Sequence, residues 1–212
     1  MNEFIDLSHI LNADCPAFPG DPQIIIQRTA GIENNGYRMT QLKLSTHTAT
    51  HVDAPAHMIS DGRFLNQYPV SRFTGRALVI KIPEGIKRIS KQFLSSFEKD
   101  LSEAEFVLFN TGWGKYWGKE NYFAGFPVPE AEAAEWLTSF YIKGIGIDTP
   151  SVDPSESTSW DIHHILFYSD LIIVENLVFP EIQETITGDF FCFPLSLDQA
   201  DGSPVRALLQ PD

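Results

Sequence analysis

The sequence predicts a single α/β domain that spans residues 1–212. Apolar runs with strand character recur along the chain, and a segment with helical spacing over 129–141 leads directly into a predicted strand over 144–148. Such a helix-to-strand step is typical of mixed α/β structure. The chain has no internal repeat and no clear linker, and its 212 residues fit one large domain or at most two small ones.

The expected elements follow from apolar runs bounded by turn residues. The loop over 15–22 holds three prolines, so it is predicted to be rigid, and it carries the aromatic ring of Phe18. The turn signal Asn34-Asn35-Gly36 separates two predicted strands. Strands are predicted over residues 4–8, 23–30, 37–46, 77–82, 106–110, 144–148, 171–176, 190–197 and 205–209, and helices over 90–97, with Ser90 as N-cap, and 129–141.

Composition and charge limit the classes of function. A hydrophobic fraction of 43% is that of a globular protein with a sizeable core. The net charge of −13 argues against nucleic acid or an anionic membrane as the partner. Cys15 and Cys192 are the only cysteines; a disulfide between them stays open, but a secreted disulfide framework is not indicated. No signal peptide or membrane-spanning run is apparent, so we expect a cytoplasmic protein.

Five of the six histidines fall into two clusters, and the first is the denser. His47, His51, Asp53 and His57 lie at even spacings, which on an extended chain would put all four side chains on one face. Pro55 argues against a helix continuing there. Imidazole nitrogens and a carboxylate on one face predict a site for zinc or a similar divalent ion.

The second cluster is His163-His164, which precedes a predicted buried strand that carries Glu175. A buried carboxylate needs a partner or a metal to offset its desolvation. Each of these side chains alone is more often structural, but the two clusters together favour a metal site. The sequence has no G-x-S-x-G elbow, no G-x-G-x-x-G or P-loop glycine pattern and no C-x-x-C pair, and nothing supports a cysteine nucleophile.

The segment His47-Thr48-Ala49-Thr50-His51-Val52-Asp53-Ala54-Pro55-Ala56-His57 resembles a family signature, H-x-G-T-H-x-D-x-P-x-H. It is that of the metal-dependent cyclase hydrolases, a family that includes bacterial kynurenine formamidase and isatin hydrolase. Ten of the eleven positions fit. Similar landmarks occur at 6–8, 18–21, 111–113 and 146–153. The family's H-x(11)-E element is matched by His163 and Glu175, which selects His163 over His164.

The resemblance implies a barrel-like mixed β-sheet core with flanking helices, of the swivelling β/β/α type, and a homo-oligomer, either a dimer or a tetramer. It also implies two divalent ions per chain, zinc or manganese. His47, His51 and Asp53 would hold one ion, with Asp53 bridging to a second ion that His163 and Glu175 complete. His57 would be the proton shuttle.

Two positions depart from the family pattern and bear on the substrate. Phe18 stands where the formamidases have a substrate-stacking tryptophan, and the resemblance makes it a substrate-binding residue. Ala49 stands where the family usually has glycine, which can adopt a positive φ or allow close approach. The alanine either tolerates an ordinary backbone angle or narrows the pocket by one methyl group.

The implied activity is that of a metal-dependent amidohydrolase, similar to an arylformamidase of tryptophan catabolism, acting on a small N-formyl aromatic amine such as N-formylkynurenine. A metal lowers the pKa of bound water from about 15.7 to about 7, which supplies hydroxide at neutral pH. His57 can pass a proton to the departing amine. Phe18 and the region of Trp113 are expected to pack an aromatic ring of the substrate.

Two alternatives stay open. One is a hydrolase or cyclase for another small ester or lactam. The other is a non-catalytic module that binds a metal or a ligand, which would have no need for His57 beyond its ligand set.

Overall fold

The computed structural model describes residues 3–180 and 182–212. Within these ranges, nine strands form one mixed sheet, with the order β1-β13-β11-β5-β7-β9-β10-β4-β12. The four strands β5, β7, β9 and β10 are parallel, and antiparallel strands flank them. The nine strands are β1 (Ile5–Asp6), β4 (His51–Asp53), β5 (Thr74–Lys81), β7 (Phe106–Asn110), β9 (Gly144–Ile147), β10 (Ile172–Glu175), β11 (Ile186–Phe191), β12 (Gly202–Pro204) and β13 (Leu208–Pro211).

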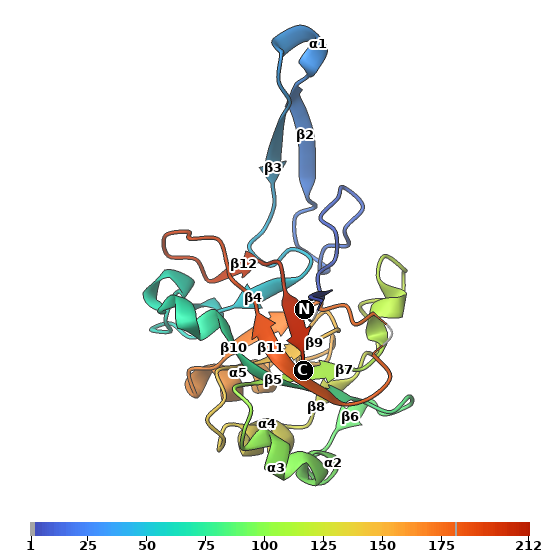
Figure 1. Cartoon of the computed structure of the whole chain (residues 1–212), viewed down its shortest axis with the longest axis vertical. Coiled ribbons are helices and arrows are strands. Elements are labelled where there is room, and N and C mark those ends of the chain that lie inside the picture. The colour runs from blue at the N-terminus through green and yellow to red at the C-terminus, as the bar shows by residue number, and fades with distance from the viewer. Residues whose placement is uncertain (1–2, 181) are drawn as a thin grey trace.

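Helices cover one face of this curled sheet (Figure 1). They are α2 (Lys91–Leu94), α3 (Glu98–Leu101), α4 (Ala131–Leu137) and α5 (Asp161–Tyr168). Side chains alternate along β5, so Leu78 and Ile80 pack on the helices while Ala77 and Val79 enter a second core between the sheet and its antiparallel strands. The central strands are therefore buried on both faces, as their continuous apolar sequence predicts. The α/β, barrel-like prediction is confirmed.

Most predicted elements are present, with shifted ends. The Ser90 hydroxyl accepts a hydrogen bond from the Phe93 amide at 3.2 Å, which confirms the predicted N-cap. Of the helix predicted over 129–141, only α4 is helical. It begins after Pro129, because Pro129 pairs as part of β8 (Val128–Pro129) with β6 (Arg88–Ile89). Helix α5 was not predicted. The strand predicted over 190–197 begins earlier, as β11, and ends before Pro194.

A two-stranded hairpin projects from the body of the molecule (Figure 1). It consists of β2 (Ile25–Ala30) and β3 (Met39–Lys43), and we call residues 25–43 the arm. The predicted turn between its strands is instead a short helix, α1 (Ile32–Asn35), which ends because Gly36 adopts a left-handed conformation with φ of 78°. Large apolar side chains along the arm are about half exposed: Ile25, Ile32, Tyr37, Met39 and Leu42.

The structure answers the question of a disulfide. Cys15 and Cys192 are both buried free thiols, so no disulfide joins them. Among the helices in the described part of the chain, none has the length and apolar character needed to cross a membrane.

Candidate metal centre

The β4 segment brings the first histidine cluster together. His51 and Asp53 lie on one face of β4, while the side chain of Val52, the residue between them in the sequence, points into the core on the opposite face. The even-spacing prediction holds for this pair only. His47 lies in the turn before the strand, and His57 ends a short 3₁₀ turn that starts at Pro55.

The four side chains are gathered as predicted, but not by the extended chain that the even-spacing argument assumed. The chain bends at both ends of β4 and folds the outer histidines back over the strand. The ring centroid of His47 lies 5.2 Å from that of His51 and 3.9 Å from that of His57.

Strand pairing adds the second cluster. Strand β10 runs antiparallel to β4 and puts Glu175 opposite His51, with 3.6 Å between His51 Nε2 and Glu175 Oε2. Helix α5 supplies His163, whose Nε2 lies 3.4 Å from Glu175 Oε1. The Val152 amide donates a hydrogen bond to the same oxygen at 3.1 Å. Glu175 thus lies between the two histidine clusters.

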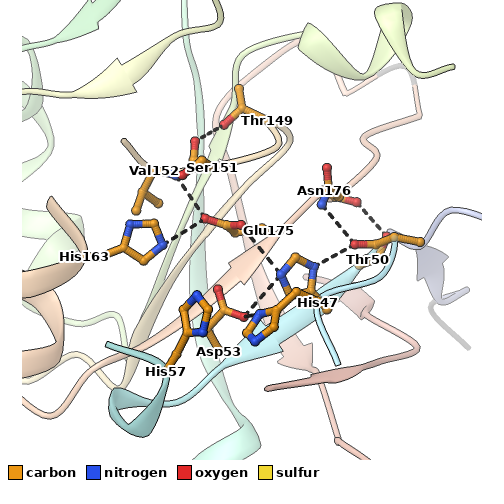
Figure 2. A network of polar contacts seen from close by, with 12 residues as sticks. His47, Thr50, Asp53, His57, Thr149, Ser151, Val152, His163, Glu175 and Asn176 are labelled. Carbon is orange, nitrogen blue, oxygen red and sulfur yellow. Dashed lines mark hydrogen bonds and ion pairs between the residues drawn. The ribbon is translucent and has the colours of Figure 1, made fainter. Parts of the chain in front are cut away.

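Asp53 occupies the corresponding place on β4. Its Oδ1 lies 2.6 Å from His47 Nδ1 and 3.2 Å from His51 Nε2. Figure 2 shows the two carboxylates with the labelled histidine rings arranged around them. Two groups of possible ligand atoms share Asp53, and within each group the atoms lie within 4.8 Å of one another: His47, His51 and Asp53, and Asp53, His163 and Glu175.

His47, His51 and His163 are held as the histidine ligands of metal ions usually are. Each turns one ring nitrogen toward the carboxylates and the other toward an oxygen acceptor. That acceptor is the Ala49 carbonyl for His51, at 2.8 Å, and Asp153 for His163, at 2.6 Å. For His47 it is Asp201, at 3.0 Å. When the ring is neutral, such a contact favours the tautomer whose inward nitrogen can bind an ion. These residues fit a divalent ion with nitrogen and oxygen ligands.

Asp153 and Asp201 were not predicted as site residues. Asp153 accepts hydrogen bonds from the amides of Ile162 and His163, both at 3.0 Å, so it caps the start of α5 as well as holding the His163 ring. Its only signal in the sequence was its place in the landmark over 146–153. Asp201 lies just before β12 and against His47.

The electrostatics separate His57 from the other histidines. Burial alone would lower the pKa of His47, but Asp53 and Asp201 outweigh it and raise the pKa to about 10. Burial also opposes the charged form of His163, whose pKa still rises to about 9 because of its hydrogen bonds to Asp153 and Glu175. For His57 burial dominates and lowers the pKa, which favours the neutral ring at neutral pH.

A cavity of about 520 Å³ opens onto this cluster, and Phe18 lines it, as the substrate-binding prediction requires. The Phe18 ring lies 5.7 Å from Phe123 and 6.4 Å from Trp160, which also line the cavity. The region of Trp113 contributes Phe123 to the cavity wall, but Trp113 itself does not line the cavity. The Trp113 indole N–H donates to the Tyr122 carbonyl inside an aromatic cluster against which Phe123 packs.

Ala49 adopts a positive φ of 54°, so the ordinary backbone angle left open by the sequence is not the one used. This conformation directs the Ala49 carbonyl toward His51 Nδ1 and toward Asn176 Nδ2, which donates at 3.0 Å. The left-handed region costs an alanine about 1 kcal/mol relative to glycine. Ala49 also lines the cavity, so its methyl group occupies space near the cluster.

Comparison with known proteins gives consistent results. The chain matches the model of a family named "Putative cyclase" over residues 5–154. The kynurenine formamidase of Bacillus mycoides (strain KBAB4) is 35% identical to it, covering 99% of this chain and 98% of that protein. A structure of an isatin hydrolase bound to the product analogue thioisatinate has a TM-score of 0.88 at 23% identity, over 99% and 93% of the two chains. A potential metal-dependent hydrolase with cyclase activity has a TM-score of 0.80 at 26% identity, over 98% and 96%.

Proposed function

This chain belongs to the cyclase family, and we propose that it is a metal-dependent hydrolase for a small amide, with residues 1–212 forming one domain. The substrate we propose is an N-formyl aromatic amine such as N-formylkynurenine, because similar proteins carry the name kynurenine formamidase. One observation carries the proposal. Two groups of ligand atoms share Asp53 beside a cavity that is lined by aromatic rings.

Two divalent ions, zinc or manganese, are proposed for the cluster. His47, His51 and Asp53 would hold one, and His163 and Glu175 would hold the other, with Asp53 shared between them. A divalent ion supplies carbonyl polarisation and a lowered pKa of bound water, to about 7. The carboxylates offset the charge of the ions, and the fixed ring tautomers keep the ligand nitrogens directed inward.

His57 is the residue we propose for proton transfer. It lies outside both groups that share Asp53, and its side chain is 27% exposed, so it lies between the buried cluster and the cavity. Its lowered pKa keeps the ring able to accept a proton. Because Nδ1 faces Asp201, Nε2 is the atom that would take a proton and return it to the departing nitrogen.

The rings of Phe18, Phe123 and Trp160 are proposed to hold the aromatic part of the substrate. Offset and edge-to-face contacts among such rings orient a bound ring and exclude water from the carbonyl beside it. Phe18 offers a smaller stacking surface than the tryptophan that the family resemblance implies at this position.

A homo-oligomer in the cytoplasm, a dimer or tetramer, belongs to the same proposal. The arm supports it, because a two-stranded hairpin with several half-exposed apolar side chains is marginal in water unless another surface covers it. Light scattering after size-exclusion chromatography measures the mass directly. A monomer at micromolar concentration would contradict this part of the proposal.

A substrate screen tests the proposed activity. The purified protein is stripped with a chelator and reloaded with zinc or manganese. It is then assayed with N-formylkynurenine, a second N-formyl aromatic amine, an aryl ester and an aromatic lactam. We expect metal-dependent release of formate. Preference for the lactam or the ester would favour the alternative hydrolase. Stoichiometric metal binding without any turnover would favour a binding module.

A further inference from the structure

Asp201 is fixed in place by the strand that follows it. Its carbonyl accepts a hydrogen bond from the Ala54 amide at 2.8 Å, and the next residue, Gly202, pairs with Asp53 in the sheet. Its Oδ1 accepts a hydrogen bond from the Thr46 hydroxyl at 3.1 Å. The carboxylate is therefore anchored to both ends of the β4 segment.

The other carboxylate oxygen faces two histidines at once. Asp201 Oδ2 lies 3.0 Å from His47 Nε2 and 3.5 Å from His57 Nδ1, and the two rings are inclined by 34°. The first contact is a hydrogen bond. The second is longer, as contacts of proton-transfer groups often are before substrate binds.

The close approach of this strand to the site depends on Gly202. A Cβ atom at position 202 would lie 2.6 Å from His47 Cε1, which is far inside van der Waals contact. The bare backbone lets the turn pass directly against the His47 ring, and this brings the Asp201 carboxylate within reach of both histidines.

No lysine or arginine pairs with Asp201 among the residues that the structure describes; its side-chain partners are Thr46, His47 and His57. The carboxylate thus differs from a surface ion pair such as that of Asp6 with Arg206. Its ionisable partners among the described residues are the two histidines.

We propose that Asp201 is a positioning residue that holds His47 and His57 through one carboxylate oxygen. It would fix His47 with Nδ1 toward the metal centre and His57 with Nε2 toward the substrate. This inference rests on the proposed function for its kinetic consequence only, because the two ring orientations can be measured without turnover.

The test compares Asp201→Ala and Asp201→Asn with Asp198→Ala. Asp198 belongs to the same connection, but its carboxylate accepts from Asn66 at the surface, so it is a matched control. Metal affinity is measured by competition with a chromophoric chelator. We expect a loss of about 10- to 100-fold for the Asp201→Ala variant, as for other groups that orient metal ligands, and no change for the control.

The second readout, for His57, uses histidine ring ¹⁵N chemical shifts, which are assigned with a His57→Ala variant. In the wild type we expect the Nδ1–H tautomer of His57, and in Asp201→Ala a shift toward the Nε2–H tautomer. Asp201→Asn keeps one acceptor oxygen and should change both readouts less than alanine does. Thermal melts of each variant identify any loss of folding.

Kinetics at saturating metal provide the third readout. Asp201→Ala should lower kcat by about 10-fold or more with little change in KM, and it should cause almost no further loss in the His57→Ala background. The proposal is overturned if metal affinity is unchanged, if the His57 tautomer is unchanged, or if the two kinetic losses multiply. If the wild type turns over no substrate, the proposed function fails, while the affinity and tautomer readouts still decide this inference.

Discussion

The site has a deep half and a shallow half that are built in different ways. The deep half consists of His51, Asp53, His163 and Glu175, each at most 5% exposed. The shallow half consists of His47, His57 and Asp201, whose side chains are 15%, 27% and 39% exposed. Strand pairing between β4 and β10 and the capped start of α5 fix the deep half. In the shallow half, contacts with the Asp201 side chain orient the rings of His47 and His57.

This difference assigns different tasks to the two halves. Backbone pairing holds ligand atoms rigidly, which suits metal binding. Partly exposed side chains next to a cavity can exchange protons and meet a substrate. Changes in the deep half should therefore remove metal, and changes to His57 in the shallow half should remove turnover while metal stays bound.

The largest effect is expected for Asp53→Ala. Both proposed ion sites share this carboxylate, and its removal leaves His47 and His51 without their buried counter-charge. We expect loss of both ions and a fall in kcat/KM of at least about 10³-fold, since the metals supply the main catalytic term. Metal analysis by mass spectrometry and a formate assay measure the two losses. Retention of both ions would show that Asp53 is not shared.

His163 and His164 form a matched pair on α5 for the next test. His163 turns toward Glu175, whereas His164 Nδ1 donates to the Trp160 carbonyl at 3.0 Å. His163→Ala should lose one ion and about 100-fold in activity, by the logic of a removed ligand. His164→Ala should keep two ions. Equal metal loss in both variants would contradict the assignment.

His57→Ala probes the shallow half. The ring supplies no ligand atom to the two groups that share Asp53, so the variant should bind two ions as the wild type does. Loss of a proton-transfer group typically lowers kcat by about 10²- to 10⁴-fold. Metal analysis and kcat measurements on the same sample separate the two effects. Full turnover in this variant would mean that another group moves the proton.

Metal affinity should increase with pH. The raised pKa values of His47, about 10, and His163, about 9, mean that protons occupy these rings in the metal-free protein and compete with the ions. Between pH 6 and 9 the affinity should therefore rise by about tenfold per pH unit for each proton displaced. Chelator competition at several pH values measures the slope. A flat profile would mean that the rings are neutral before binding.

The same shifts set the stability of the metal-free protein. Because the folded-state pKa values lie above the ordinary histidine value, these groups stabilise the fold fully below about pH 6.5. Their contribution is lost as the pH rises through about 9 to 10. Metal-free protein should therefore become less stable from this source as the pH rises, while metal binding becomes stronger.

The smallest effect is expected for Ala49→Gly. Glycine adopts the φ of 54° without the strain that a Cβ imposes, so unfolding should cost about 1 kcal/mol more. Ala54→Gly is the control, because Ala54 is buried with an ordinary φ of −101° and should lose stability. Urea unfolding measures both. A destabilised Ala49→Gly variant would mean that the methyl group contributes more by packing than it costs in strain.

The sequence predicts the local parts of this molecule better than the parts that depend on pairing. The α/β class and buried strands such as 106–110 follow from apolar runs, and the His47–His57 segment carries its own residue pattern. Asp201 could not be found in this way, since its contact with His47 exists only because β12 pairs with β4 across more than a hundred residues of chain. Trp160 was missed for a similar reason, because the course of the loop before α5 brings it to the cavity.

Gly202 has a consequence for how this sequence can diverge. It has no side chain to take part in any reaction, yet even a methyl group there would displace the His47 ring. Asp198, four positions earlier, is an exposed residue where many side chains fit. The number of tolerated substitutions should therefore fall sharply from Asp198 to Gly202. A saturation-mutagenesis library of this connection should show intolerance at Gly202, which binds nothing itself but lies against the proposed metal ligand His47.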